Sequence, residues 1–195
     1  MKKLYTFDPI TGKYIGEVDA ELDEWQTEIA GYECYKLIAN SVWEKPEEQE
    51  GYTPYMYNGE WTLIKNPTLD ELKAEKLKEI DAWTANKIVG GFTSNASGAP
   101  VRYDSDKDTQ LTMQGIALNV DTQLFAEKYP QGCPVRGYAE GADVKSIFML
   151  TPEQVMQWQA DLSIHIGTCK QQGWGKQAEV EKANSVAELE AIVLG

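Results

Sequence analysis

The sequence has no long apolar run. None of its stretches approaches the roughly 20 consecutive apolar residues that a membrane-spanning helix needs. The first residues, MKKLYTFDP, carry two lysines without an apolar segment behind them, which is not the pattern of a signal peptide. The apolar fraction of 42% and the charged fraction of 25% are ordinary for a folded protein. We therefore expect no membrane span, and folding in a cytoplasm.

Cysteine and histidine are scarce. Cys34, Cys133 and Cys169 are far apart and form no CxxC pair, which argues against a disulfide framework or a zinc site. The single histidine, His165, lies four residues before Cys169 and can share a helix face with it. A metal or nucleophile pair there needs further ligands, and none has matching spacing. We therefore interpret His165 as a packing residue and expect no metal and no cofactor.

The motifs of common enzymes are missing as well. The glycine-rich segment 90–98 follows a predicted helix, whereas a phosphate-binding loop precedes one, and no GxSxG elbow occurs. Segment 104–108 resembles a calcium loop, but Thr109 and Gly115 stand where such a loop needs Gly and Glu. The acidic residues are numerous enough for a glycosidase pair, yet short elements leave little room for a substrate cleft. We expect that the protein is not an enzyme.

Positive charge is also limited. The formal net charge is −13, and the sequence contains no basic run that would neutralise phosphates. This argues against binding to nucleic acid and to an anionic membrane surface. An acidic surface keeps a protein in solution and can steer a basic partner towards it.

Residues 1–66 have the pattern of a small antiparallel β module. Asn58-Gly59 is the residue pair that a type I′ turn prefers, and aromatic residues flank it on both sides. Residues 53–64 are therefore predicted to form a hairpin in which Met56 pairs with Trp61 and Tyr57 with Glu60. The other elements predicted in this module are strands at 4–7, 13–18 and 32–38, and a short helix or loop at 21–29.

Residues 67–195 alternate between helices and hairpins. Capping boxes begin at Thr68, Thr151 and Ser185, each with Glu or Gln three residues later. Two hairpins that alternate with helices indicate an antiparallel sheet covered by helices, so the predicted fold class is α+β. The predicted elements are helices at 68–89 and 106–129, a helix from Thr151 that Gly173–Gly175 can interrupt, a short C-terminal helix through Leu194, and hairpins at 92–105 and 134–150.

The candidate binding residues are Tyr55, Tyr57 and Trp61, which belong to an aromatic cluster in the acidic module. One interpretation is that these aromatics form the core of a small β domain. The other is that one hairpin face is exposed and presents aromatics to a partner, because such side chains dominate interface hot spots. Tyr55 and Tyr57 share one face and Trp61 lies on the opposite face. The sequence leaves open which face is buried.

Several segments resemble tail-fibre assembly proteins and related short tail proteins of bacteriophages and prophages. YTFDPITGKYIGEVDAELD is similar to the opening of such proteins, and YMYNGEWTLI is similar to their NG-x-W strand. From Leu69 to Leu194 the chain resembles an uncharacterised C-terminal domain common in phage tail proteins. The segments that carry this second resemblance are LKAEKLKEIDAW, VRYDSD, TQLTMQGIA, TPEQV and NSVAELEAI.

The resemblance implies an assembly role without catalytic residues. Fibre-assembly proteins are chaperones that bind the distal end of a trimeric tail fibre while it folds, and some stay on the finished particle as a tip. The implied partner is a phage tail-fibre protein, and the implied location is the bacterial host cytoplasm or the virion tail. A structural or receptor-binding tail component, which stacks aromatics on host-surface sugars, is the alternative; a small regulatory or anti-host protein is a third. Helix 68–89 is long and charged enough to pack against a second copy, so a homo-oligomer also stays open.

Overall fold

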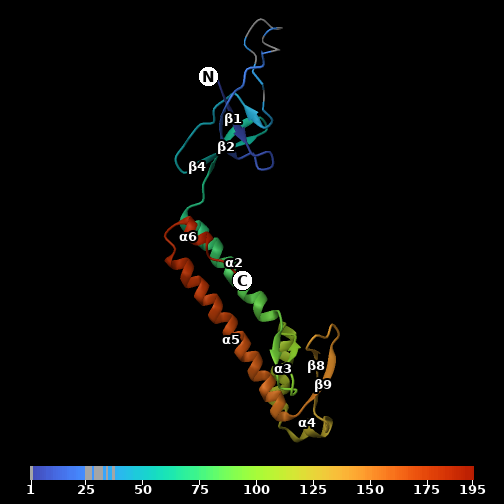
Figure 1. Ribbon diagram of the computed structural model, residues 1–195. Helices are drawn as coiled ribbons and strands as arrows, with labels where there is room; N and C mark the ends of the chain where they lie inside the picture. Colours follow the sequence, from blue (N-terminus) through green and yellow to red (C-terminus); the bar gives the residue numbers. More distant parts are fainter. Residues whose placement is uncertain (1, 25–27, 29–32, 34, 37) are drawn as a thin grey trace. The chain divides into compact units, whose positions relative to one another are not determined.

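The computed structural model describes residues 2–24, 28, 33, 35–36 and 38–195 (Figure 1). The chain divides into two compact units, Met1–Thr68 and Leu69–Gly195. The sequence had placed a boundary between residues 66 and 67. The first unit contains antiparallel strands and the second is mainly helical with two β-hairpins, which confirms the predicted α+β class. No helix in the described part of the chain combines the length and the apolar character needed to cross a membrane.

The first unit is built from two antiparallel sheets. A three-stranded sheet has the order β2-β1-β3, and a two-stranded sheet pairs β4 with β5. The strands are β1 (Lys3–Phe7), β2 (Tyr14–Asp19), β3 (Ser41–Val42), β4 (Tyr52–Tyr57) and β5 (Glu60–Lys65). Parts of the predicted element at 21–29 and of the predicted strand at 32–38 lie outside the described residues. In the described parts of these two segments, Leu22 and Tyr35 form an isolated antiparallel bridge.

Two turns position the strands of the first unit. Between β1 and β2, the Asp8 carboxylate accepts hydrogen bonds from the backbone of Ile10 (3.0 Å) and Thr11 (2.7 Å), as a short polar side chain in a turn often does. The hydrogen bonds from Thr11 and Ile10 hold the pKa of Asp8 below its usual value. Between β4 and β5, Asn58 (φ 51°) and Gly59 (φ 86°) both adopt positive φ, as a type I′ turn requires.

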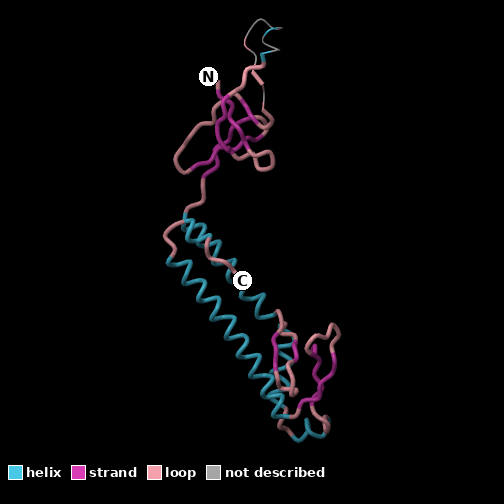
Figure 2. Tube along the Cα trace, in the orientation of Figure 1, coloured by secondary structure: helices cyan, strands magenta, loops and turns pink. Residues whose placement is uncertain are grey.

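The second unit contains a four-stranded antiparallel sheet with the order β6-β7-β8-β9 (Figure 2). Alternate side chains point inward to a core that includes Tyr103 and Trp158. The opposite, outer face carries Arg102 and Arg136, which are the only arginines in the sequence. The strands are β6 (Phe92–Ser94), β7 (Val101–Tyr103), β8 (Cys133–Ala139) and β9 (Ser146–Leu150).

Helices α2 and α5 lie side by side along much of their length, as both ribbon and tube show (Figures 1 and 2). Gln177 donates a hydrogen bond to Asp81 across the pair (2.7 Å). A second core, centred on Ile80 and Val180, joins these two helices to α6. The helices of this unit are α2 (Leu69–Val89), α3 (Lys107–Asn119), α4 (Gln123–Lys128), α5 (Pro152–Lys182) and α6 (Val186–Glu190).

The single helix predicted at 106–129 is wrong, because the segment forms two helices. The chain leaves α3 at Val120, which is buried in the core. Thr122 then caps α4: its hydroxyl accepts from the Phe125 backbone N–H (3.3 Å) and donates to the Asn119 carbonyl (2.7 Å). A threonine at this position satisfies backbone groups that a helix start leaves free, so a new helix begins there.

The interruption that was possible at Gly173–Gly175 does not occur, and α5 continues from Pro152 to Lys182. Gly173 is buried where α5 faces α2, and a Cβ at this position would collide with the Thr84 hydroxyl. The glycine is therefore explained by the close approach of two helices and not by a break. The capping box at Thr151 is confirmed: its hydroxyl accepts from the Gln154 backbone N–H (3.3 Å), and the Gln154 side chain accepts from the Thr151 backbone N–H (2.9 Å).

Candidate partner-binding surface

The two faces of the β4–β5 hairpin differ in their surroundings. Met56 pairs with Trp61 and Tyr57 pairs with Glu60, which confirms the predicted register. Because neighbouring residues of a strand point to opposite faces, Tyr55 and Tyr57 share one face while Trp61 points to the other. The structure therefore brings two of the three candidate residues together and separates the third from them.

Trp61 is half-buried within the first unit. Its ring makes edge-to-face contacts with Phe7 (centroids 6.2 Å apart) and Tyr14 (5.7 Å). Its indole Nε1 donates to the carbonyl oxygen of Glu44 (2.9 Å). These contacts join the hairpin to the three-stranded sheet, so this face of the hairpin has a structural role.

Replacing Trp61 with alanine should destabilise the first unit by about 2 kcal/mol. This loss of stability arises because the variant lacks two aromatic contacts and a hydrogen bond. It is smaller than the loss expected for a fully buried tryptophan, because part of the Trp61 ring is exposed to solvent. Urea denaturation followed by near-ultraviolet circular dichroism measures the change. Tyr57→Ala is the matched control and should stay within about 0.5 kcal/mol of the wild type, because Tyr57 is exposed. Equal loss in both variants would contradict the assignment of faces.

The opposite side, the outer hairpin face, is open to solvent. It consists of Thr53, Tyr55, Tyr57, Glu60, Thr62 and Ile64, which pair across the two strands. The side chain of Tyr57 is 70% exposed and that of Ile64 is 49% exposed. Tyr55 is half-buried, and Lys13 lies opposite it through an isolated bridge. Aromatic and aliphatic side chains exposed on one sheet face are typical of a contact surface for a partner.

His165 and Cys169 lie together on α5, but their contacts indicate packing. The His165 Nε2 atom is 3.2 Å from the carbonyl oxygen of Lys87, and the ring packs against Phe92 (centroids 6.2 Å apart). The Cys169 sulfur is buried and lies 3.8 Å from His165 Nε2. Among the described residues, which do not include Cys34, no group of three or more His, Cys, Asp or Glu side chains could hold a metal ion.

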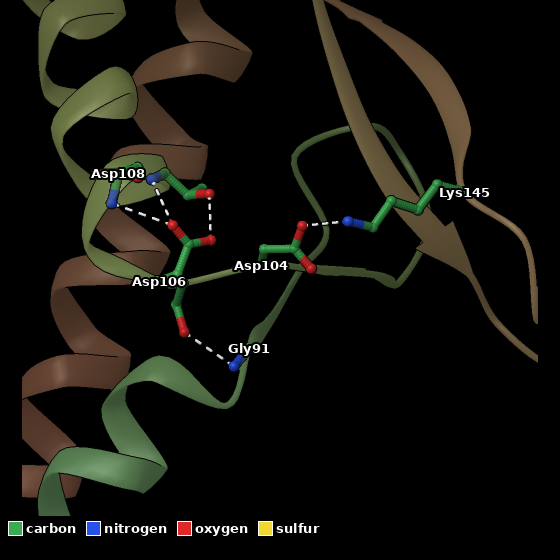
Figure 3. A network of polar contacts seen from close by, with 7 residues as sticks. Gly91, Asp104, Asp106, Asp108 and Lys145 are labelled. Carbon is green, nitrogen blue, oxygen red and sulfur yellow. Dashed lines mark hydrogen bonds and ion pairs between the residues drawn. The ribbon is translucent and has the colours of Figure 1, made fainter.

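Asp104 and Asp106 of segment 104–108 have separate structural roles (Figure 3). Asp106 caps α3, and its carboxylate accepts from the Thr109 hydroxyl (2.6 Å) and from two backbone N–H groups. The hydrogen bond from Thr109 is the main cause that lowers the pKa of Asp106. Asp104 points away from this cap and forms an ion pair with Lys145. The helix start predicted here is therefore confirmed, with Asp106 as its cap.

Residues 71–193 match the family described as a domain of unknown function, DUF4376. The chain belongs to this family. No curated protein matches the sequence, and no solved structure matches it. The DUF4376 domain includes almost all of the second unit, from the first turn of α2 to beyond α6. Tyr55, Tyr57 and Trp61 all lie outside it, so the outer hairpin face is a feature of the segment that precedes the domain.

The DUF4376 domain contains a pocket that the sequence did not indicate. The pocket has a volume of about 350 Å³ and lies between α3, β8 and the core. Asp108 and Arg136 both line it, although they are 28 residues apart and belong to a helix and a strand. No local pattern connects two such residues, because only the folding of α3 and β8 onto a common core brings them to one place. The pocket is lined by Tyr103, Asp104, Asp108, Thr109, Thr112, Ile116, Pro134, Val135, Arg136, Lys145 and Trp158.

Proposed function

We propose that the protein is an assembly chaperone for a bacteriophage tail fibre. In this proposal it binds the distal part of a trimeric fibre in the host cytoplasm, before the fibre closes. The observation that carries the proposal is the outer hairpin face of this acidic chain, on which Tyr57 and Ile64 are exposed and Tyr55 is half-buried. The resemblance of the N-terminal segment to fibre-assembly proteins supports the same function.

The physical problem that such a chaperone solves is aggregation. An unassembled β-rich fibre exposes strand edges and apolar surface, both of which pair readily with other chains. A tyrosine supplies a large apolar ring and a hydroxyl with little loss of conformational freedom, so it covers such a surface efficiently. The high negative charge of the chain would keep the complex in solution.

Co-expression of the protein with a tail-fibre gene encoded beside its own gene tests this proposal. We expect severalfold more soluble trimeric fibre with the wild type than without it. The double variant Tyr57→Ala, Ile64→Ala should lose most of this gain, since both side chains are exposed and contribute little to the fold. Leu118→Ala is the matched control, because Leu118 is 83% exposed but lies on α3 of the other unit.

Two results of this experiment would contradict the proposal, the first its chaperone function and the second its contact surface. Equal amounts of soluble fibre with and without the protein would show that folding does not depend on it. If the double variant gave as much soluble fibre as the wild type, the outer hairpin face would not be the contact surface.

The exposed ring of Tyr57 also supports a second candidate function, a structural or receptor-binding component of the tail. An exposed tyrosine ring can stack on a sugar ring of a host surface polysaccharide. In this case the purified protein should bind host polysaccharide, and Tyr57→Ala should abolish binding while Tyr57→Phe, which keeps the ring, retains it. Trp61→Ala is unsuited to this test because it removes contacts within the first unit.

A further inference from the structure

The pocket of the second unit has an apolar floor and a charged rim. Tyr103, Val135 and Trp158 are buried in the core and form part of its wall, with the rings of Tyr103 and Trp158 5.5 Å apart. Four charged residues, two acidic and two basic, lie at its rim: Asp104, Asp108, Arg136 and Lys145. Small-molecule sites commonly combine apolar walls with a few polar groups in this way.

Two of the four charges neutralise each other. Lys145 donates to the carboxylate of Asp104, and the two side chains point towards one another (Figure 3). The Lys145 ammonium also lies 5.3 Å from the centre of the Tyr138 ring. This pair therefore has its partners within the protein.

The other two charges belong to Asp108 and Arg136, whose side chains are exposed at the rim of the pocket. In the part of the chain that the structure describes, neither the Arg136 guanidinium nor the Asp108 carboxylate forms a hydrogen bond or an ion pair. They carry opposite charges and line the same pocket, yet they are not paired with each other. Asp108 is not needed to cap α3, since Asp106 has that role.

A third group at this pocket also lacks a partner. Trp158 is 4% exposed, and its indole Nε1 has no hydrogen-bond acceptor among the described residues. A buried N–H group without an acceptor is unfavourable, and such groups are rare in folded proteins. A bound molecule whose hydrogen-bond acceptor reached the Trp158 N–H group would supply the missing hydrogen bond, which would favour binding.

We propose that this pocket binds a free α-amino acid with an apolar side chain. The carboxylate of the ligand pairs with Arg136, whose planar guanidinium suits a carboxylate, and its ammonium group pairs with Asp108. Its side chain lies against Ile116, Val135 and Trp158. The volume of about 350 Å³ is near the lower end for small-molecule sites, which favours a ligand of this size over a larger one.

The test is an NMR titration of the intact protein with L-phenylalanine and L-leucine. Two derivatives of each remove one charge at a time: the N-acetyl form has no ammonium group, and the amide form has no carboxylate. The indole Nε1–H resonance of Trp158 reports binding, and it is assigned with Trp158→Phe. We expect at least one of the two amino acids to bind about tenfold more tightly than either of its derivatives, because each derivative loses a charge-assisted contact.

Variants of the two unpaired charges should respond selectively. In Asp108→Asn, the preference for the amino acid over its N-acetyl form should disappear, while the preference over the amide remains. In Arg136→Gln the opposite pattern is expected. Arg102→Gln and Asp121→Asn are the matched controls: Arg102 lies on the neighbouring strand, where its guanidinium contacts Tyr138, and neither residue lines the pocket. Neither control should alter binding.

The proposal is overturned if neither amino acid shifts the Trp158 resonance at millimolar concentration. It is overturned equally if the derivatives bind as tightly as the amino acids, or if the controls weaken binding as much as Asp108→Asn and Arg136→Gln. None of these outcomes depends on the outer hairpin face, because the pocket and that face belong to different units.

Discussion

Replacing Gly137 with valine should lower the free energy of unfolding of the second unit by more than about 3 kcal/mol. Gly137 lies on the inner face of β8, where even a Cβ atom would be 2.5 Å from Val101 Cγ1 and 2.9 Å from Tyr103 Cδ1. Tyr103 cannot move aside easily, because it is buried between Phe92 (ring centroids 5.7 Å apart) and Trp158 (5.5 Å). Added volume in a closely packed core forces strained side chains or a shifted backbone.

Urea denaturation followed by far-ultraviolet circular dichroism measures this loss. Gly115→Ala is the control, since a Cβ at Gly115 meets nothing within 4 Å and the residue lies inside α3. That substitution should stabilise the unit by up to about 1 kcal/mol, because alanine favours a helix over glycine. An unchanged midpoint for Gly137→Val would mean that β8 does not approach β7 as closely as described.

Replacing Ile80 with alanine should cost about 4 kcal/mol. Ile80 is fully buried in the second core, where α2 packs against Val180 of α5 and Leu189 of α6. The truncation removes apolar contacts and leaves a cavity that three helices cannot easily close. Thermal and urea denaturation should both show the loss, and the amides of α6 should exchange with solvent faster, because α6 is a short helix that depends on this core.

Ile164→Ala provides the matched control for this second core. Ile164 is 65% exposed on α5, so its truncation should change stability by less than about 0.5 kcal/mol. A similar loss in both variants would indicate that Ile80 is not a centre of packing. A loss of amide protection confined to α6 would instead show that this helix opens separately from the α2–α5 pair.

The features that the sequence predicted correctly are specified by neighbouring residues. The Asn58-Gly59 pair predicts its turn, and through the turn it sets the pairing of Met56 with Trp61. The capping box at Thr151 is likewise complete within four residues. Such signals need no knowledge of the rest of the fold, because the hydrogen bonds that they form are local.

The features that were missed depend on contacts between distant segments. Gly173 was taken as a possible break because glycine is unfavourable in helices, but its packing against Thr84 of α2 is what requires it. The break after Asn119 similarly reflects the burial of Val120 and the cap at Thr122. In each case tertiary packing outweighed the local preference.

The candidate sites show the same division. The sequence placed Tyr55 and Tyr57 on one hairpin face, but only the contacts of Trp61 with Phe7 and Tyr14 identify the opposite face as the packed one. The sequence did not predict the pocket at Asp108 and Arg136. Asp108 and Arg136 come to line one pocket only when α3 and β8 fold onto a common core.

The position of the two arginines also affects how the protein can be digested. Arg102 and Arg136 are both held in paired strands of one sheet, and the first unit contains no arginine at all. Proteases require a segment of chain that is locally unfolded. An arginine-specific protease therefore cleaves only molecules whose β7–β8 region has opened. The rate of this cleavage therefore depends on the opening of the DUF4376 domain alone. Cleavage at arginine thus measures the opening of the second unit while the first unit is present, and it needs no added label.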